Sequence, residues 1–169
     1  MLRIFTTGGT FDKVYFDANS EFQIGDSEIP EMLREANVTF DIAVESVLRK
    51  DSLELTDEDR QILYERVAKV PETRVLITHG TDTMVQTAQL LLADEREKLG
   101  GKTIVITGAM QPSRMRRSDA MFNLGFAVAA VQVLQSGVYL AMNGRLFDPR
   151  EARKNVQAHR FEAISRKPG

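Results

Sequence analysis

Cysteine is absent from this sequence of 169 residues. Its absence excludes disulfide bonds, thiolate nucleophiles and cysteine-based metal or redox centres, and it fits a reducing compartment. Histidine is scarce, because His79 and His159 are the only two, and two histidines make no metal cluster. We therefore expect a site built from hydroxyl, carboxylate and amine groups, with no metal ion.

Long apolar runs and a strong net charge are also lacking. The longest apolar-rich stretch, 121–134, is interrupted by Asn123, Gly125 and Gln132 and is too short to span a bilayer. No apolar stretch of signal-peptide length precedes the first polar residues. A net charge of -2 gives no broad field for nucleic acid. We therefore predict a cytoplasmic protein that binds a small molecule, without a membrane or nucleic-acid partner.

The order of the apolar segments predicts an α/β protein. Short runs rich in β-branched residues predict strands at 2–5, 40–47, 74–77, 102–106 and 138–142. Segments with helical spacing predict helices at 29–36, 57–69, 83–99 and 118–135. Thr56 and Asp59 have capping-box spacing before the second helix, Pro71 ends that helix, and the glycines at 100–101 close the third.

This alternation defines the expected fold. Right-handed crossovers produce a doubly wound, mostly parallel sheet with helices on both faces, in three layers with a flavodoxin-like strand order. The length suits a single domain over 1–169. After about 155 the periodicity fades, so a polar tail from about 156 and an extra edge element both stay open.

Ligands of such a sheet bind at the carboxyl ends of its strands, near the first and third strands. The loops there are 7–10 and 78–83, both composed of glycines and polar residues, and 107–110 and 143–144 hold equivalent places. Glycine permits close approach of the backbone to a ligand, and free N–H groups hold an anion or an oxyanion. The spacing predicts a polar ligand site.

The nucleophile is harder to assign from residues alone. No G-x-S-x-G elbow is present, and threonine hydroxyls need a base, for which His79, His159, a neutral lysine or a carboxylate are available. A lysine acts as a base only where its surroundings lower its pKa by several units. Without further information the reaction therefore stays open.

Several blocks together carry a resemblance. They are Thr7-Gly8-Gly9-Thr10-Phe11, His79-Gly80-Thr81-Asp82-Thr83-Met84, Thr107-Gly108-Ala109-Met110-Gln111-Pro112, Ser118-Asp119-Ala120 with Phe122-Asn123-Leu124, and Met142-Asn143 followed by Asp148, Arg150 and Lys154. In this order and spacing the chain resembles the bacterial-type L-asparaginases over nearly its whole length. The resemblance implies hydrolysis of the side-chain amide of asparagine, and sometimes glutamine, through an acyl-enzyme on threonine. It implies no cofactor.

The resemblance also implies roles for particular residues. Thr10 matches the nucleophile, while Thr81, Asp82 and Lys154 match a second catalytic group, in which Asp82 also holds the substrate α-amino group. The backbones of Gly9 and Gly80 are expected to contact the substrate. Read singly, Thr10 suits a turn or helix cap, Asp82 a helix start and Lys154 a solvated basic run.

Two further assignments follow from the same resemblance. Tyr15 is the only tyrosine in the loop where the family carries a lid tyrosine, although its spacing from Thr10 is shorter. Ser52 stands where the family contacts the substrate carboxylate, but Leu53 follows where many members have a second polar residue. Both residues are expected at the site.

The chain departs from the family in length, because familiar members carry a second, smaller domain that reaches into a neighbour's active site. A short form would either complete its site with the first domain of a neighbouring copy or leave it more open, which would weaken binding; we expect a homo-oligomer, a dimer or a tetramer. Two alternatives stay open: a non-catalytic amino-acid-binding or regulatory module, and an amidase for a different amide.

Some polar residues have simpler interpretations. His79 follows a buried strand and is expected to be a hydrogen-bonded structural histidine. Ser118 and Asp119 are expected to cap the helix that they precede. A local basic cluster predicts an exposed loop or a subunit contact, and it consists of Arg114, Arg116 and Arg117.

Overall fold

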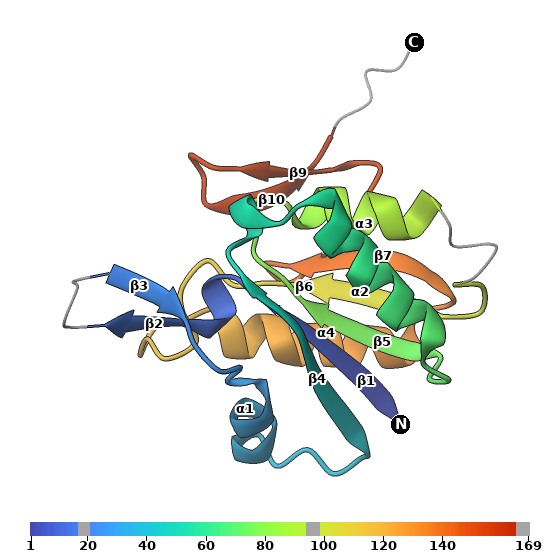
Figure 1. Cartoon of the computed structure of the whole chain (residues 1–169), viewed down its shortest axis with the longest axis horizontal. Coiled ribbons are helices and arrows are strands. Elements are labelled where there is room, and N and C mark those ends of the chain that lie inside the picture. Colours follow the sequence, from blue (N-terminus) through green and yellow to red (C-terminus); the bar gives the residue numbers. More distant parts are fainter. Residues whose placement is uncertain (17–20, 94–98, 165–169) are drawn as a thin grey trace.

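The computed structural model describes residues 1–16, 21–93 and 99–164 (Figure 1). Its strands are β1 (Leu2–Gly8), β2 (Lys13–Phe16), β3 (Glu21–Ile24), β4 (Ile42–Lys50), β5 (Arg74–Thr78), β6 (Thr103–Thr107), β7 (Gly137–Met142), β8 (Arg145–Phe147), β9 (Ala152–Asn155) and β10 (Arg160–Ala163). Its α-helices are α1 (Ile29–Glu35), α2 (Asp57–Lys69), α3 (Met84–Ala93) and α4 (Ala120–Val133), and its 3₁₀ helices are η1 (Thr10–Asp12) and η2 (Ser52–Glu54).

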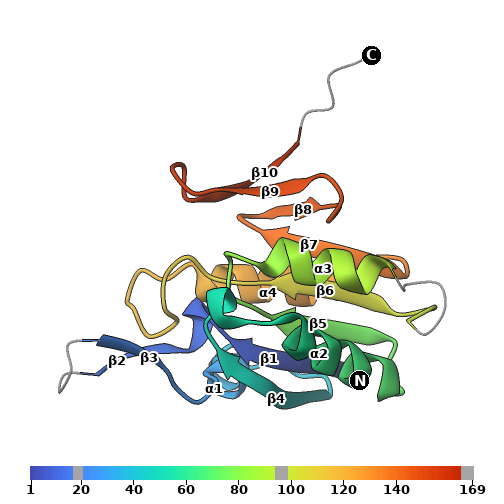
Figure 2. The same ribbon diagram turned by 45° about the horizontal axis from the view of Figure 1, so that its top comes forward.

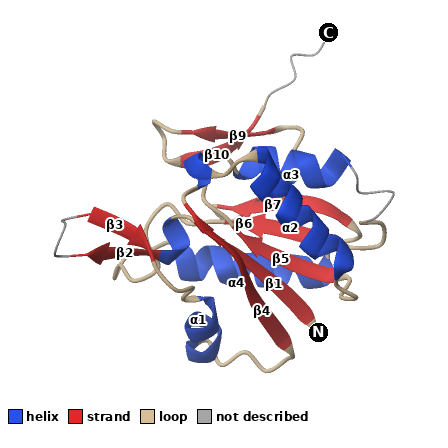
Figure 3. Ribbon diagram, viewed as in Figure 1, coloured by secondary structure: helices blue, strands red, loops and turns tan. Residues whose placement is uncertain are grey.

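The main sheet has the order β4-β1-β5-β6-β7-β8. The strands β4, β1, β5, β6 and β7 run parallel (Figure 3). The edge strand β8 pairs antiparallel with β7. The five predicted strands therefore lie in the order second, first, third, fourth, fifth. The predicted α/β class and flavodoxin-like order are confirmed, and the order reverses between β1 and β5.

Two apolar cores lie on opposite faces of this sheet. Residues of α2 and α3 pack on one face, around Phe5 and Ile77, and residues of α1 and α4 pack on the other, around Ile4 and Leu76. Successive residues of a strand point to opposite faces, so β1 and β5 contribute to both cores. The structure thus has the predicted three layers, with α2 and α3 together on one side in Figure 1.

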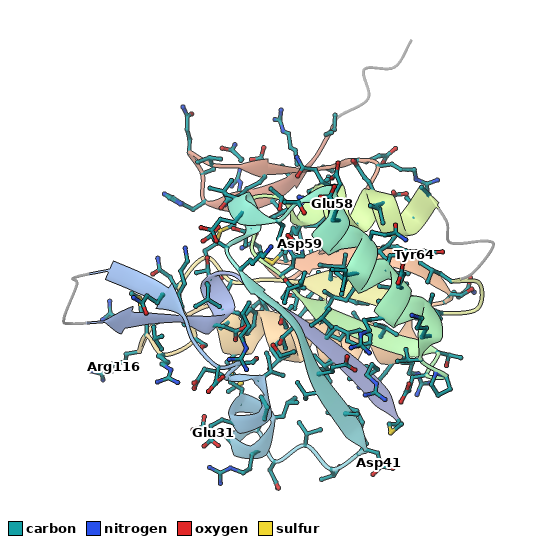
Figure 4. The ribbon with its side chains drawn as sticks, in the orientation of Figure 1. Glu31, Asp41, Glu58, Asp59, Tyr64 and Arg116 are labelled. Carbon is teal, nitrogen blue, oxygen red and sulfur yellow. The ribbon has the colours of Figure 1, made fainter. Side chains whose placement is uncertain are left out.

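Local signals explain where the helices begin and end. The capping box before α2 is present: Thr56 Oγ1 accepts from Asp59 N at 3.2 Å, and Asp59 Oδ2 accepts from Thr56 N at 3.0 Å. Figure 4 shows Asp59 at this end of α2. The helix ends at Lys69, two residues before Pro71. The predicted extension of α3 towards residue 99 runs through 94–98, which lie outside the described residues.

Two hairpins were not predicted as such. β2 and β3 pair antiparallel, with Tyr15 opposite Phe22, and β9 and β10 pair with Lys154 opposite Phe161. Residues 160–163 therefore form a strand rather than part of a polar tail, although β9 and β10 make a separate two-stranded sheet rather than a new edge of the main one. Figure 2 shows this hairpin stacked beyond β7 and β8.

α4 carries the apolar stretch that was considered too short to cross a bilayer. It has 14 residues and one face in the second core. None of the helices in the described ranges has the length and apolar character that a membrane span requires.

Candidate active site

The loops after β1 and β5 meet backbone to backbone. Gly9 has a φ of +74°, and a Cβ added to it would lie 2.5 Å from the Cα of Gly80. A Cβ added to Gly80 would in turn lie 2.6 Å from Ser52 Oγ. Side chains at these two positions would push the loops apart, so glycine brings together three residues that the sequence assigned to the substrate site.

Lys154 joins this site from a distant part of the sequence. Its Nζ donates to Thr81 Oγ1 at 2.7 Å and to Asp82 Oδ1 at 2.6 Å. Thr81 is buried in the loop after β5, while the Lys154 side chain is 17% exposed and that of Asp82 is 40% exposed. The structure therefore places three of the predicted catalytic residues in direct contact.

This contact defines what the group can do chemically. A charged hydrogen bond between an ammonium group and a carboxylate holds Lys154 and Asp82 in one geometry. A neutral amine in the same place would accept the proton of the Thr81 hydroxyl, as general-base catalysis requires. The partly exposed oxygen atoms of Asp82 also leave room for a cationic group of a ligand.

Thr10 begins η1 directly after Gly9 and is partly buried. The turn is closed by Asp12 N, which donates to Gly9 O at 3.2 Å. Because Gly9 contacts Gly80, Thr10 and Thr81 each lie one residue from the contact between the two loops. Thr10 therefore lies beside the switch point of the sheet, between β1 and β5.

Tyr15 lies on β2, in the hairpin that extends from the body of the molecule in Figure 1. Its backbone pairs with that of Phe22. The side chain of Tyr15 lies outside the described part of the structure. Its role as a lid tyrosine therefore stays a prediction.

Asp12 is a buried carboxyl group two residues after Thr10, at the end of η1. Burial raises the pKa of Asp12 to about 6, although hydrogen bonds from Ser27 and the backbone of Glu28 oppose the shift. Its Oδ1 accepts from Glu28 N at 3.3 Å, immediately before α1, and its backbone oxygen accepts from Gly25 N at 2.8 Å. Asp12 therefore ties the turn of Thr10 to both the hairpin and α1.

His79 is structural, as expected. Burial lowers the pKa of His79 to about 4, so the ring is neutral near pH 7. The ring lies between two oxygens: Nδ1 is 2.8 Å from Gly80 O, and Nε2 is 2.8 Å from Thr87 Oγ1. A carbonyl only accepts, so Nδ1 carries the hydrogen and Nε2 accepts from Thr87. His79 thus fixes the peptide of Gly80.

Ser118 and Asp119, which were expected to cap the helix α4, both make hydrogen bonds to the loop after β6 or to the start of α4. Ser118 Oγ does accept from Ala120 N, at 3.0 Å. Asp119 makes no side-chain cap, and that expectation was wrong. Its carboxylate instead accepts from Met110 N at 3.0 Å and from Gln111 N at 2.9 Å, because the loop folds back over the start of α4.

Asn123 and Asn143 received no role in the sequence analysis, but their side chains connect distant elements. Asn123 is fully buried in α4, and its Oδ1 accepts from Asn143 N at 3.3 Å. Asn143 Oδ1 accepts from Phe161 N at 3.0 Å. In the sequence, the asparagine-glycine pair at 143–144 indicated only a loop. The partner of the Asn143 side chain is the backbone N–H of Phe161, and the sequence does not show which backbone groups a side chain will meet.

The basic loop lies on the outside of the molecule. Arg114, Arg116 and Arg117 are exposed, and Arg114 pairs with Glu28. Figure 4 shows Arg116 directed away from the ribbon. The expectation of an exposed loop is confirmed. In the described ranges, no group of three or more histidine, aspartate or glutamate side chains could hold a metal ion.

Comparison with known proteins places the chain in a family. The model of the family "Asparaginase, N-terminal" matches residues 1–168. The chain therefore belongs to the asparaginase family, of which it carries the N-terminal domain.

Individual relatives agree with this result. A glutaminase-asparaginase of Acinetobacter glutaminasificans is 34% identical over 81% of this chain and 41% of its own length. A probable periplasmic L-asparaginase of Haemophilus influenzae is 31% identical over 90% of the chain and 46% of its own length. The solved structure of a probable cytoplasmic L-asparaginase from Campylobacter jejuni has a TM-score of 0.77 at 28% identity, over 96% of this chain and 52% of that one. The chain spans about half the length of these relatives.

Proposed function

We propose that this chain is an L-asparagine amidohydrolase that releases L-aspartate and ammonia through an acyl-enzyme on Thr10. The observation that carries the proposal is the contact of Lys154 Nζ with Thr81 Oγ1 and Asp82 Oδ1, at 2.7 and 2.6 Å. Lys154 lies on β9, 73 and 72 positions after Thr81 and Asp82, which lie in the loop after β5. Family membership supports the reaction class.

In the first step, the Thr10 hydroxyl oxygen attacks the carbon of the side-chain amide, and its proton is taken up by a base. Backbone N–H groups of the glycine loops stabilise the negative oxygen that forms. The proton then passes to the amide nitrogen, the carbon–nitrogen bond breaks, and ammonia leaves. The aspartyl group is left as an ester on Thr10.

In the second step, water attacks the ester and regenerates the enzyme. Lys154, in its neutral form, takes a proton through Thr81, because its Nζ lies within hydrogen-bond reach of that hydroxyl. The ester bond breaks, L-aspartate is released, and the Thr10 oxygen recovers a proton. Lys154 is thus assigned as the base and Thr81 as the hydroxyl that relays the proton.

The remaining contacts suit an α-amino acid. Asp82 offers a partly exposed carboxylate to the α-amino group. Ser52 is 1% exposed, and its Oγ has no hydrogen-bond partner in the described ranges. Because an unpaired buried hydroxyl is costly, a substrate carboxylate at Ser52 would satisfy it. The glycines at 9 and 80 keep the backbone close enough for a small ligand.

Thr10→Ala tests the nucleophile directly. We expect ammonia release from L-asparagine to fall by about 10⁴-fold or more, because the oxygen that forms the ester is gone. Thr10→Ser is the matched control, since it keeps the hydroxyl and should retain measurable turnover. Wild-type turnover in Thr10→Ala would show that Thr10 is not the nucleophile.

A non-catalytic amino-acid-binding module is the second candidate, because the carboxylate of Asp82 and the hydroxyl of Ser52, which is unpaired among the described residues, would hold an amino acid equally well without turnover. Calorimetry with L-aspartate and L-asparagine, combined with an ammonia assay over hours, separates the two. Binding without ammonia would favour the module. Comparing asparagine, glutamine and simple amides would in turn identify an amidase for another amide.

The assembly is also a proposal. Exposed apolar side chains lie on residues next to the site, with Leu53 at 74% beside Ser52 and Val156 at 65% two residues from Lys154. A second copy of the chain that covers these residues would both bury them and close the site. The cytoplasmic location stays a prediction, since relatives described as periplasmic and as cytoplasmic both exist.

A further inference from the structure

The position of Lys154 depends on a hairpin outside the main sheet. Lys154 lies on β9, which pairs with β10 in a two-stranded sheet, and its register partner is Phe161. A two-stranded hairpin has little stability by itself, so its placement depends on what it contacts. Whatever holds Phe161 therefore also holds the strand that delivers Lys154.

Two interactions hold Phe161. Its side chain is 2% exposed, and its ring centroid lies 6.4 Å from that of Phe147. Both rings belong to the apolar core that also contains residues of α2 and α3. Its backbone N–H donates to Asn143 Oδ1 at 3.0 Å. An apolar contact is not directional, so it does not by itself fix the position of β10. The hydrogen bond is directional and fixes the backbone of Phe161 relative to the turn after β7.

Asn143 is itself fixed from the opposite direction. Its backbone has a φ of +54°, and its N–H donates to Asn123 Oδ1 at 3.3 Å. Asn123 Nδ2 donates to Gly108 O and to Asp119 Oδ2, each at 2.9 Å. A continuous set of hydrogen bonds therefore runs from the loop after β6, through α4 and the turn after β7, to β10.

We propose that Asn143 is a positioning residue, which holds the β9–β10 hairpin so that Lys154 Nζ stays against Thr81 and Asp82. The effect on rate rests on the proposed function, whereas the effect on the placement of Lys154 does not. Asn143 acts through the backbone of Phe161 and needs no contact with the substrate.

Three substitutions isolate this role. Asn143→Gly removes the acceptor oxygen but keeps the positive φ, which glycine adopts freely. Asn143→Asp keeps an acceptor at the same place and should restore the wild-type behaviour. Asn37→Gly is the matched control, because Asn37 has a φ of +51° at the end of α1, away from the hairpin. Thermal unfolding of all three establishes that they fold.

Kinetics give the first readout. For Asn143→Gly we expect kcat to fall by about 10- to 100-fold, because a small misplacement of a catalytic group has that effect, with KM changing far less. Asn143→Asp and Asn37→Gly should stay close to wild type. An unchanged kcat in Asn143→Gly would overturn the proposal, as would an equal loss in Asn143→Asp, which would assign a direct role to the amide.

Acetylation of lysines gives a second readout that needs no activity. Each folded variant is treated with an amine-reactive acetylating reagent, and labelling of Lys154 is measured by mass spectrometry against Lys69, whose side chain is 73% exposed. Labelling of Lys154 should rise severalfold in Asn143→Gly alone. Unchanged labelling in that variant would overturn the proposal, whether or not the wild type releases ammonia. A wild type without ammonia release but with the expected labelling pattern would contradict only the proposed function.

Discussion

At the scale of single residues, Lys154 shows how much a strand register decides. In sequence it stands between Arg153 and Asn155 in a polar run. In the structure, alternation along β9 gives neighbouring side chains different surroundings: Arg153 is 63% exposed and pairs with Glu162, whereas Lys154 contacts Thr81 and Asp82. Two adjacent basic residues therefore have different surroundings.

Replacing each of them provides a test. Lys154→Met keeps the bulk of the side chain and removes the amine, so we expect ammonia release to fall by about 10²- to 10⁴-fold. The free energy of unfolding should change by only about 1 kcal/mol, because the ion pair is partly exposed. Arg153→Met is the matched control and should keep its activity. Equal turnover in wild type and Lys154→Met would exclude Lys154 as the base.

Asp12 provides a test of pH dependence. Its pKa is about 6 in the folded state and 3.8 for the ordinary group. Between pH 3.8 and about pH 6, the folded protein therefore holds a proton on Asp12 that the unfolded chain has released. This contribution to stability is fully present below about pH 4 and is lost as the pH rises through about 6. Asp12→Asn mimics the protonated form and can still accept from Glu28 N.

The expected result is a variant that is more stable than wild type at pH 8 by about 1 to 3 kcal/mol, since one pKa unit corresponds to about 1.4 kcal/mol. Urea unfolding at pH 8 and pH 4 measures the difference, which should shrink at the lower pH. Asp41→Asn, at an exposed position, should differ from wild type by no more than about 0.5 kcal/mol. If the two proteins differed in their free energy of unfolding by the same amount at pH 8 and pH 4, the ionised Asp12 side chain would not be the cause.

Prediction at this scale was uneven for physical reasons. Thr10, Thr81, Asp82 and Lys154 were predicted because the blocks that contain them have a characteristic order. Spacing alone supported only a polar ligand loop around the first three, and it gave Lys154 no role. Asn143 was given no role because its contacts depend on a positive φ and on a backbone donor of Phe161, and a single sequence records neither.

At the scale of elements, the five main strands followed from apolar runs, and the start of α2 followed from its capping box. The hairpins did not, because each strand has four residues and neither hairpin has an apolar run long enough to stand out. Their pairing partners lie outside the main sheet, so the β-α alternation gave no indication of them. The site nevertheless depends on one of them.

Alanine substitutions at Gly80 and Gly125 test how closely the loops after β4 and β5 are packed, because Gly80 lies at the contact between these loops and Gly125 does not. Gly80→Ala would place a Cβ 2.5 Å from Ser52 Cβ, so we expect the loops after β4 and β5 to separate and ammonia release to fall by about 100-fold. Gly125→Ala in α4 meets nothing within 4 Å. It should keep full activity and raise the free energy of unfolding by about 0.5 to 1 kcal/mol, because alanine favours helices. Activity assays and urea unfolding of both proteins check these outcomes, and full activity in Gly80→Ala would contradict the tight contact.

At the scale of the whole molecule, the expected homo-oligomer has a direct measurement. Light scattering coupled to size exclusion should give at least twice the chain mass of 19.0 kDa. Leu53→Ser should shift the mass towards the monomer and lower activity together, because Leu53 is exposed beside Ser52. A wild type that is both monomeric and fully active would show that the site needs no second copy.

The separation in sequence between Lys154 and Thr81 also bears on synthesis. The loops that carry Thr10 and Thr81 leave the ribosome well before β9 and β10 do, and Lys154 reaches its partners across 73 positions of sequence. During translation, the ligand loops therefore exist for a time without their lysine. A nascent chain that has not yet produced β10 would carry these loops without the proposed base, so the proposed catalysis requires β10 to have docked on the turn after β7.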